Sequence, residues 1–341
     1  MHIWPKFCIH SLQAKSNKTR FLLLAGLSAL FFLSILLGLL LGSQGYTVTQ
    51  LLAGLSAGWE DPVYRILLYA RLPRVLGAAL AGSALALSGM LIQSVLNNPM
   101  ASPNIIGVNA GAGFFGLLFS ILIPGSAPMA SFFGALLTAL FIFGLSKKAG
   151  LSRTTLILAG VAVNAILNAG VQALNTLFPE LAIGSSGFMA GSFSGVTLVA
   201  LGKALWFLIP GALLALMLTT ELNVLRLGEE TAAGLGMPVD RVRFLTVLAA
   251  ALLAGGAVSF AGLLGFVGLL VPHMARKFFG SDNRWLYPGC LLLGSSLVIL
   301  CDTLSRVLFA PFELPVGILL AVLGGPFFLW LLLQRKGRRA L

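Results

Sequence analysis

The sequence predicts an all-α polytopic membrane protein with about ten transmembrane helices, and three observations support this. Hydrophobic residues make up 58% of the 341-residue chain and charged residues only 9%, whereas a soluble domain is about 45–50% apolar and about 25% charged. The 10 acidic and 22 basic side chains cannot cover a body of this size in water. The 40 glycines lie among Leu, Ala and Phe runs, as in packed membrane helices. These features exclude an ordinary soluble globule and favour a single membrane domain.

Ten apolar segments account for the predicted spans. The first, residues 21–41, carries no charge, and at about 1.5 Å of rise per residue it crosses a hydrocarbon core of about 30 Å. A cleavable signal peptide has a shorter apolar core of about 7–15 residues, so we expect this helix to be retained. The others are residues 72–96, 105–123, 128–146, 154–177, 197–219, 244–261, 266–279, 286–303 and 316–334. The eighth span is short, and whether it crosses fully is open.

The basic residues predict the orientation. An even number of spans places both termini on one side, and if that side is the cytoplasm, 17 of the 22 bases lie inside, as the positive-inside rule expects. The chain then has a cytoplasmic tail (residues 1–20), one transmembrane domain (21–334) with a long internal loop (221–243), and a basic cytoplasmic tail (335–341). Because the bases flank apolar runs, the net charge of +12 indicates topology and not nucleic-acid binding.

Reactive groups are scarce in the predicted spans. Nine of the ten acidic residues fall in loops, and only Asp302 lies near a span interior, with Arg306 one turn later as its expected partner. Ion-coupled carriers usually need such groups at membrane depth, so a secondary active transporter with Asp302 as its coupling residue is one alternative. The histidines and cysteines lack metal-ligand spacing, and no phosphate-binding loop occurs. We therefore predict no catalytic residue, no metal site and no cofactor.

One span has a polar face. Asn164, Asn168, Gln172 and Asn175 recur at steps of four, four and three, which places them on one side of a helix. Uncharged amides can bind a polar solute or a neighbouring helix without burying a charge. The stripe therefore lines a transport pathway or forms an interhelical amide ladder. The Gly- and Ser-rich residues 179–195 that follow are too polar to span, which indicates a re-entrant or surface element at the outer mouth.

Two internal segments carry further signals. Residues 97–104 contain two prolines that stop helices, which predicts a tight turn between the second and third spans. In the loop 221–243, Gly228, Glu229 and Glu230 begin a short predicted helix that Gly236 and Pro238 end. With Leu235 and Met237 in a charged loop, this helix is either a docking knob for a soluble partner or an ordinary solvated loop helix.

At these residues the chain resembles the FecCD family, the membrane permease subunits of binding-protein-dependent ABC importers for iron-siderophores, haem and cobalamin. The matching segments are Arg71-Leu72-Pro73-Arg74, Gly82 to Gly89, Asn98-Pro99-Met100-Ala101-Ser102-Pro103 with Gly107-Val108, Gly228-Glu229-Glu230 with Leu235-Gly236, residues 265–273 with Arg276, Gly280-Ser281-Asp282, and Pro315-Val316-Gly317 with Gly324-Gly325-Pro326. They extend in order from the first loop to the last span.

The resemblance implies a multi-pass permease of the bacterial inner membrane that pairs with a second permease subunit, identical or related. The partners are an ATP-binding subunit, which hydrolyses the ATP, and an extracytoplasmic substrate-binding protein, with membrane lipid around them. This chain would itself be no enzyme. The substrate would be a ferric siderophore, haem or cobalamin, and the sequence does not choose among them.

The resemblance also implies roles for individual residues. The amide stripe would line the translocation pathway, and the turn at Asn98 and Met100 would help to close an inner gate. The coupling helix would comprise Gly228, Glu229, Glu230, Ala233, Leu235 and Gly236. Arg71, Arg74 and Arg306 would meet glutamates of the binding protein on the outer face, where charge pairing fixes docking register; snorkelling of these arginines to lipid headgroups is the alternative.

Overall fold

The computed structural model describes residues 17–42, 45–150 and 153–337, and every regular element in these ranges is helical. Much of the predicted tails, residues 1–16 and 338–341, lies outside the described residues. Helices lie at all ten predicted positions: α1 (Asn17–Leu40), α4 (Leu72–Val95), α5 (Val108–Leu122), α6 (Ala127–Lys148), α7 (Arg153–Leu177), α9 (Leu198–Met217), α12 (Val239–Ala261), α13 (Val267–Phe279), α14 (Asn283–Val307) and α15 (Val316–Gly337). The all-helical fold class is therefore confirmed.

The lengths of these helices differ. Seven candidate spans are long and apolar enough to cross a bilayer, and one of them runs unbroken from residue 62 to the end of α4. Helix α5 and the segment Val316–Leu329 of α15 are shorter apolar helices. Helix α13 has 13 residues, or about 20 Å at about 1.5 Å per residue, too short for a core of about 30 Å. The ten crossings and the side on which the termini lie stay predictions.

Helix α4 forms the centre of the bundle, and 78% of its most apolar window is buried. It packs against α12, α13 and α14, and glycines bring its backbone close to those of α13 and α14. A Cβ atom on Gly82 would collide with the carbonyl of Gly294 in α14, and one on Gly89 would collide with the backbone of Gly268 in α13. The small-residue motifs of the sequence are thus helix-crossing points, as is typical of membrane bundles.

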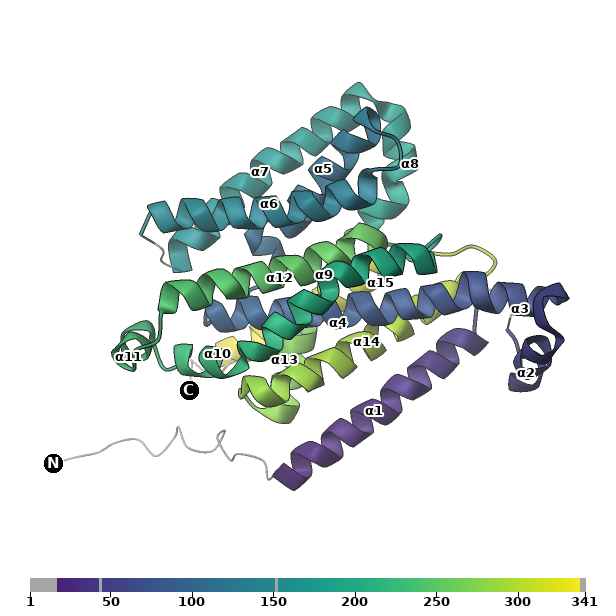
Figure 1. Cartoon of the computed structure of the whole chain (residues 1–341), viewed down its shortest axis with the longest axis horizontal. Helices are drawn as coiled ribbons and strands as arrows, with labels where there is room; N and C mark the ends of the chain where they lie inside the picture. The colour runs from purple at the N-terminus through teal and green to yellow at the C-terminus, as the bar shows by residue number, and fades with distance from the viewer. Residues whose placement is uncertain (1–16, 43–44, 151–152, 338–341) are drawn as a thin grey trace.

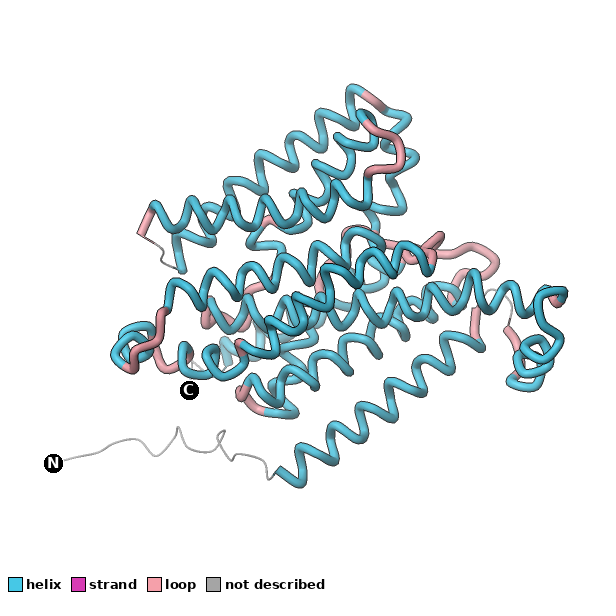
Figure 2. The backbone as a smooth tube through the Cα atoms, viewed as in Figure 1, coloured by secondary structure: helices cyan, strands magenta, loops and turns pink. Residues whose placement is uncertain are grey.

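The helices are arranged in layers, with α5, α6 and α7 on one side of the central group and α1 on the other (Figure 1). Short loops join the helices at the two ends of the bundle (Figure 2). The outermost helices α1 and α7 bury only 11% of their apolar windows. These two surfaces are therefore free to contact lipid or another subunit.

Several short helices were not predicted. The segment between α1 and α4 forms α2 (Val48–Ala57), a 3-10 turn η1 (Gly58–Glu60), α3 (Pro62–Ile66) and a π turn η2 (Leu67–Arg71) that leads into α4. Thr47 and Gln50 form a capping box at the start of α2, which satisfies backbone donors that would otherwise lack partners. The π turn directly precedes Pro73, whose ring and missing N–H disturb the preceding turn.

The internal loop 221–243 is mostly helical, which corrects its predicted extent. Helix α10 (Thr219–Leu225) follows α9, α11 (Glu229–Gly234) follows α10, and α12 begins at Val239, five residues before the predicted span. Of residues 179–195, Pro179–Ala190 form the helix α8, and its place as a surface or re-entrant element at the outer mouth stays a prediction. Figure 1 places α11 at one end of the bundle and α2, α3 and α8 toward the other.

Candidate functional site

The amide stripe of α7 lies along the edge between the covered and the uncovered sides of that helix. Asn168 and Gln172 are exposed, and Asn164 and Asn175 are half-buried. The covered side packs on α5 and the turn before it, where Gly160 meets the carbonyl of Ile105 and Gly170 meets the ring of Phe114. Asn168 and Gln172 therefore form no amide ladder with the described helices of this chain, and the pathway role of the stripe stays a prediction.

Asn164 links the stripe to the predicted inner turn. Its Nδ2 donates a hydrogen bond of 2.8 Å to the carbonyl oxygen of Asn104, which lies in the 3-10 turn η3 (Pro103–Ile106). Its Oδ1 is buried without a hydrogen-bond partner, as is Oδ1 of Asn175. The two ends of the stripe therefore keep unused acceptors, while one donor holds α7 to the turn.

The turn itself is held by a side chain. Asn98 Oδ1 accepts a hydrogen bond of 3.0 Å from the backbone N–H of Met100, a local motif that stabilises turns. Met100 lines a cavity of about 10 Å³ together with Leu269, His273 and Phe327 of α13 and α15. The structure thus brings Met100 against two other helices, while Asn98 stabilises the turn that carries it; the gating role of both residues stays a prediction.

The predicted coupling helix is α11, which packs through one buried residue, Ala232. Leu235 is 68% exposed, and Glu230, Ala233 and Gly236 are exposed with it. Glu229 differs from these, because its carboxylate forms an ion pair with the buried Arg243 of α12. Most of the residues predicted to contact the ATP-binding subunit are therefore exposed, whereas Glu229 anchors α11 to α12.

A polar network fixes the segment before α11. Arg226 donates a hydrogen bond to the carbonyl of Ser281, and Asn223 Nδ2 donates one of 2.7 Å to Asp282. Burial lowers the pKa of the Arg226 guanidinium, and the nearby Asp282 carboxylate opposes that shift. A displacement of α11 would therefore be transmitted to the junction of α13 and α14.

The three predicted docking arginines do not project from the outer surface, because Arg71, Arg74 and Arg306 are only 6%, 9% and 3% exposed. Arg71 donates to the carbonyls of Leu39 and Leu40 at the C-terminal end of α1, where a cation is favoured. Nη2 of Arg306 donates a hydrogen bond of 3.1 Å to the carbonyl oxygen of Gly38. The three side chains are thus enclosed within this chain, and both their docking role and the alternative of snorkelling stay predictions.

Two carboxylates accompany these arginines. Asp302, 1% exposed, lies 3.0 Å from Nε of Arg74 and 3.2 Å from Nε of Arg306, so the predicted pairing of Asp302 with Arg306 is confirmed. Arg74 also bonds Glu313 through Nη1 at 2.6 Å. The sequence analysis missed Glu313 as a partner, although two arginines facing one aspartate indicate a second carboxylate. We call these five residues the arginine cluster.

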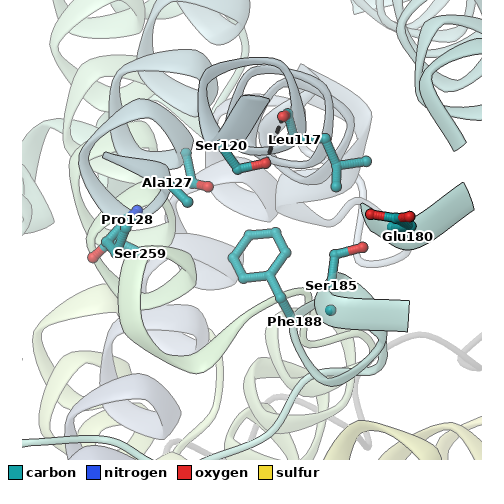
Figure 3. A pocket seen from close by; sticks show the side chains of 11 residues that line it. Leu117, Ser120, Ala127, Pro128, Glu180, Ser185, Phe188 and Ser259 are labelled. Atoms are coloured by element: carbon teal, nitrogen blue, oxygen red, sulfur yellow. Dashed lines mark hydrogen bonds between the residues drawn. The ribbon is translucent and has the colours of Figure 1, made fainter. Parts of the chain in front are cut away.

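A pocket of about 330 Å³ lies beside α8, between α5, α6 and α12. Figure 3 shows Phe188 at its centre with Glu180 and Ser185 on one side. The hydroxyl of Ser120 donates a hydrogen bond of 2.7 Å to the carbonyl oxygen of Leu117. The buried hydroxyl of Ser131 has no hydrogen-bond partner among the described residues. Within the described residues, no three His, Cys, Asp or Glu side chains gather as metal ligands.

The geometry agrees with that of known transport proteins. A solved inward-facing conformation of a metal-chelate type ABC transporter matches with a TM-score of 0.80 and 29% identity, covering 92% of this chain and 99% of that chain. The hemin transport system permease protein HmuU of Yersinia pestis is 38% identical over 299 residues, 82% of this chain and 87% of that protein.

A second relative covers more of the chain. The ferric enterobactin transport system permease protein FepD of Escherichia coli (strain K12) is 36% identical over 326 residues, 94% of this chain and 97% of that protein. The FecCD transport family matches residues 30–334, from within the first helix to the last. The chain therefore belongs to the FecCD transport family.

Proposed function

We propose that this chain is the permease subunit of an ATP-driven importer of the bacterial cell membrane, which translocates a ferric siderophore, haem or cobalamin. The observation that carries this proposal is the half-open face of α7. Its amides can hydrogen-bond a large polar solute at membrane depth, and two of them, Asn168 and Gln172, are exposed within the chain. A second permease subunit, identical or related, would face it and complete the pathway.

The energy source lies in a partner. The exposed Leu235 and the neighbouring residues of α11 provide an apolar knob on a short helix, which suits the groove of an ATP-binding subunit. A substrate-binding protein would deliver the solute to the opposite end of the bundle. Motion of α11 would reach α13 and α14 through Arg226 and Asn223.

A secondary active transporter is less well supported. A coupling carboxylate must bind and release an ion during transport. Both oxygens of Asp302 accept hydrogen bonds from Nε of Arg74, at 3.0 and 3.1 Å, and Arg306 occupies a further side. An aspartate held between two guanidiniums is a poor proton or sodium carrier.

Reconstitution in proteoliposomes tests the proposal. Vesicles would contain this chain, its ATP-binding subunit and a substrate-binding protein, and labelled ferric siderophores, haem and cobalamin would be offered with and without internal ATP. We expect ATP-dependent accumulation of one of these solutes, and none when the ATP-binding subunit is omitted. Accumulation driven by an ion gradient without ATP would contradict the importer assignment.

A further inference from the structure

The two ends of α1 are attached to the bundle in different ways. At the C-terminal end, the guanidiniums of Arg71 and Arg306 donate hydrogen bonds to the last carbonyls of the helix. At the N-terminal end, α1 contacts α14 through rings. Phe21 lies edge-on against Trp285 with the ring centroids 5.1 Å apart, and the guanidinium of Arg20 lies over the same indole, 5.5 Å from its centre. An aromatic face holds a guanidinium in place and leaves its charge uncompensated.

The guanidinium of Arg20 has a charge and hydrogen-bond donors that the chain does not use. Its Nε is buried without a hydrogen-bond partner, and none of the ion pairs among the described residues includes Arg20. No acidic residue precedes Glu60 in the sequence. Asp282, at the start of α14, already accepts hydrogen bonds from Asn223 and from the backbone N–H of Arg284. A buried donor without a protein acceptor is suited to an anion from outside the chain.

The position of Arg20 along α1 places it at the edge of the hydrocarbon core. The uncharged residues 21–41 follow it directly, and about 20 helical residues cross a core of about 30 Å. The guanidinium is therefore at the level of the lipid phosphates. Phe21, the next residue, is 63% exposed, so an acyl chain can lie beside it. Figure 1 places the start of α1 toward the end of the bundle that carries α10 and α11.

From these contacts we propose that Arg20 and Trp285 form a binding site for one anionic phospholipid, whose phosphate binds the Arg20 guanidinium and whose acyl chain lies against Phe21. A guanidinium matches the geometry of phosphate oxygens, and basic positions between membrane helices are typical sites for anionic headgroups. The exposed Arg284, next to Trp285 in the first turn of α14, adds positive charge nearby. A zwitterionic lipid carries its own ammonium group and gains less from these charges.

The site would complete the attachment of α1. A phosphate bound to Arg20 would hold the N-terminal end of α1 at the start of α14, as the buried arginines hold its C-terminal end. The start of α14 also touches α10, where Nη2 of Arg284 lies 3.5 Å from Oγ1 of Thr220. The lipid would therefore stabilise a junction of three helices that lies apart from the amide stripe of α7.

Native mass spectrometry of the full chain in detergent tests the site by counting bound lipids. The probes are dioleoyl phosphatidylglycerol, dioleoyl phosphatidylcholine, which has the same acyl chains, and inorganic phosphate. We expect the unaltered protein to retain one molecule of phosphatidylglycerol, bound about fivefold more tightly than phosphatidylcholine, the factor that one basic residue near an anionic surface contributes.

Variants locate the site. Arg20→Gln should abolish the preference for phosphatidylglycerol, and because Arg20 lies near the start of α1 its replacement leaves the packing of the bundle intact. Trp285→Leu keeps an apolar side chain but removes the ring under the guanidinium, so it should weaken the preference. Lys18→Gln is the matched charge control: two residues along a helix are about 200° apart, so the exposed Lys18 points away from the side that contacts Trp285.

Three results would overturn the proposal. An unchanged preference in Arg20→Gln would remove Arg20 from the site. Equal losses in Arg20→Gln and Lys18→Gln would indicate a general charge effect and no defined site. Displacement of the lipid by millimolar inorganic phosphate would identify a site for a free anion, because a lipid held by both its phosphate and its acyl chain resists such competition.

Discussion

Asp302 holds the arginine cluster together, so its replacement should be costly. In Asp302→Asn the side chain keeps its size but loses its charge. In the unaltered protein, Nε of Arg74 and Nε of Arg306 each lie within 3.2 Å of the Asp302 carboxylate. In the variant, both guanidiniums stay buried without that negative charge. The variant therefore tests whether Asp302 is a structural partner of two arginines or a carrier of transported ions.

The expected magnitude follows from burial. Removing one partner of a buried ion pair costs about 3–5 kcal/mol, and Asp302 is 1% exposed. Glu313 is 35% exposed, and exposed pairs contribute about 0–1 kcal/mol. Asp302→Asn should therefore lower the free energy of unfolding several times more than Glu313→Gln, although both substitutions remove one negative charge that contacts Arg74.

Unfolding of the purified protein in mixed micelles of dodecyl maltoside and SDS, followed by far-UV circular dichroism, measures this difference. The double variant Asp302→Leu with Arg306→Met is the control, because replacing a buried pair by apolar residues is often neutral, and it should recover part of the loss. An Asp302→Asn protein as stable as the unaltered chain would refute the reasoning. If that stable protein had also lost gradient-driven uptake, the secondary-transporter alternative would regain support.

Three further predictions concern packing, coupling and the pathway. Gly82→Val places a side chain against the carbonyl of Gly294, and we expect a loss of about 1–3 kcal/mol or more in the same unfolding assay, whereas Gly26→Val, with open space around it, should be neutral. Leu235→Asp should weaken co-purification of the ATP-binding subunit at least tenfold without affecting folding; the equally exposed Leu227→Asp is the control, and equal losses would contradict a role of α11. Asn168→Leu with Gln172→Leu should reduce uptake at least tenfold while ATPase association persists, and normal uptake would remove the stripe from the pathway.

The helices were predictable because their signal is local. A run of about 20 apolar residues identifies a membrane helix without any knowledge of its neighbours, and a helix lies at each predicted position. Helices α2 and α3 were missed because they are too short for that signal. Their caps were nevertheless present in the sequence: Thr47 with Gln50, and Asp61 before Pro62.

The partners of the arginines were less predictable because they are remote in sequence. Arg306 and Asp302 are four residues apart, and helix geometry alone predicted their pairing. Arg74 is 228 residues from Asp302 and 239 from Glu313, and no periodicity relates such positions. The burial of the three arginines follows from the packing of α1, α4 and α14, which the sequence does not display.

The attachment of α1 has a consequence for the order in which the protein is made. Arg306, which donates to the carbonyl of Gly38, is separated from it by 268 residues, and α14 is the main neighbour of α1. At a synthesis rate of about 5–20 residues per second, Arg306 emerges roughly 10–60 s after Gly38. During that time α1 must remain in lipid without its main neighbour, which its uncharged sequence from residue 21 to residue 41 allows.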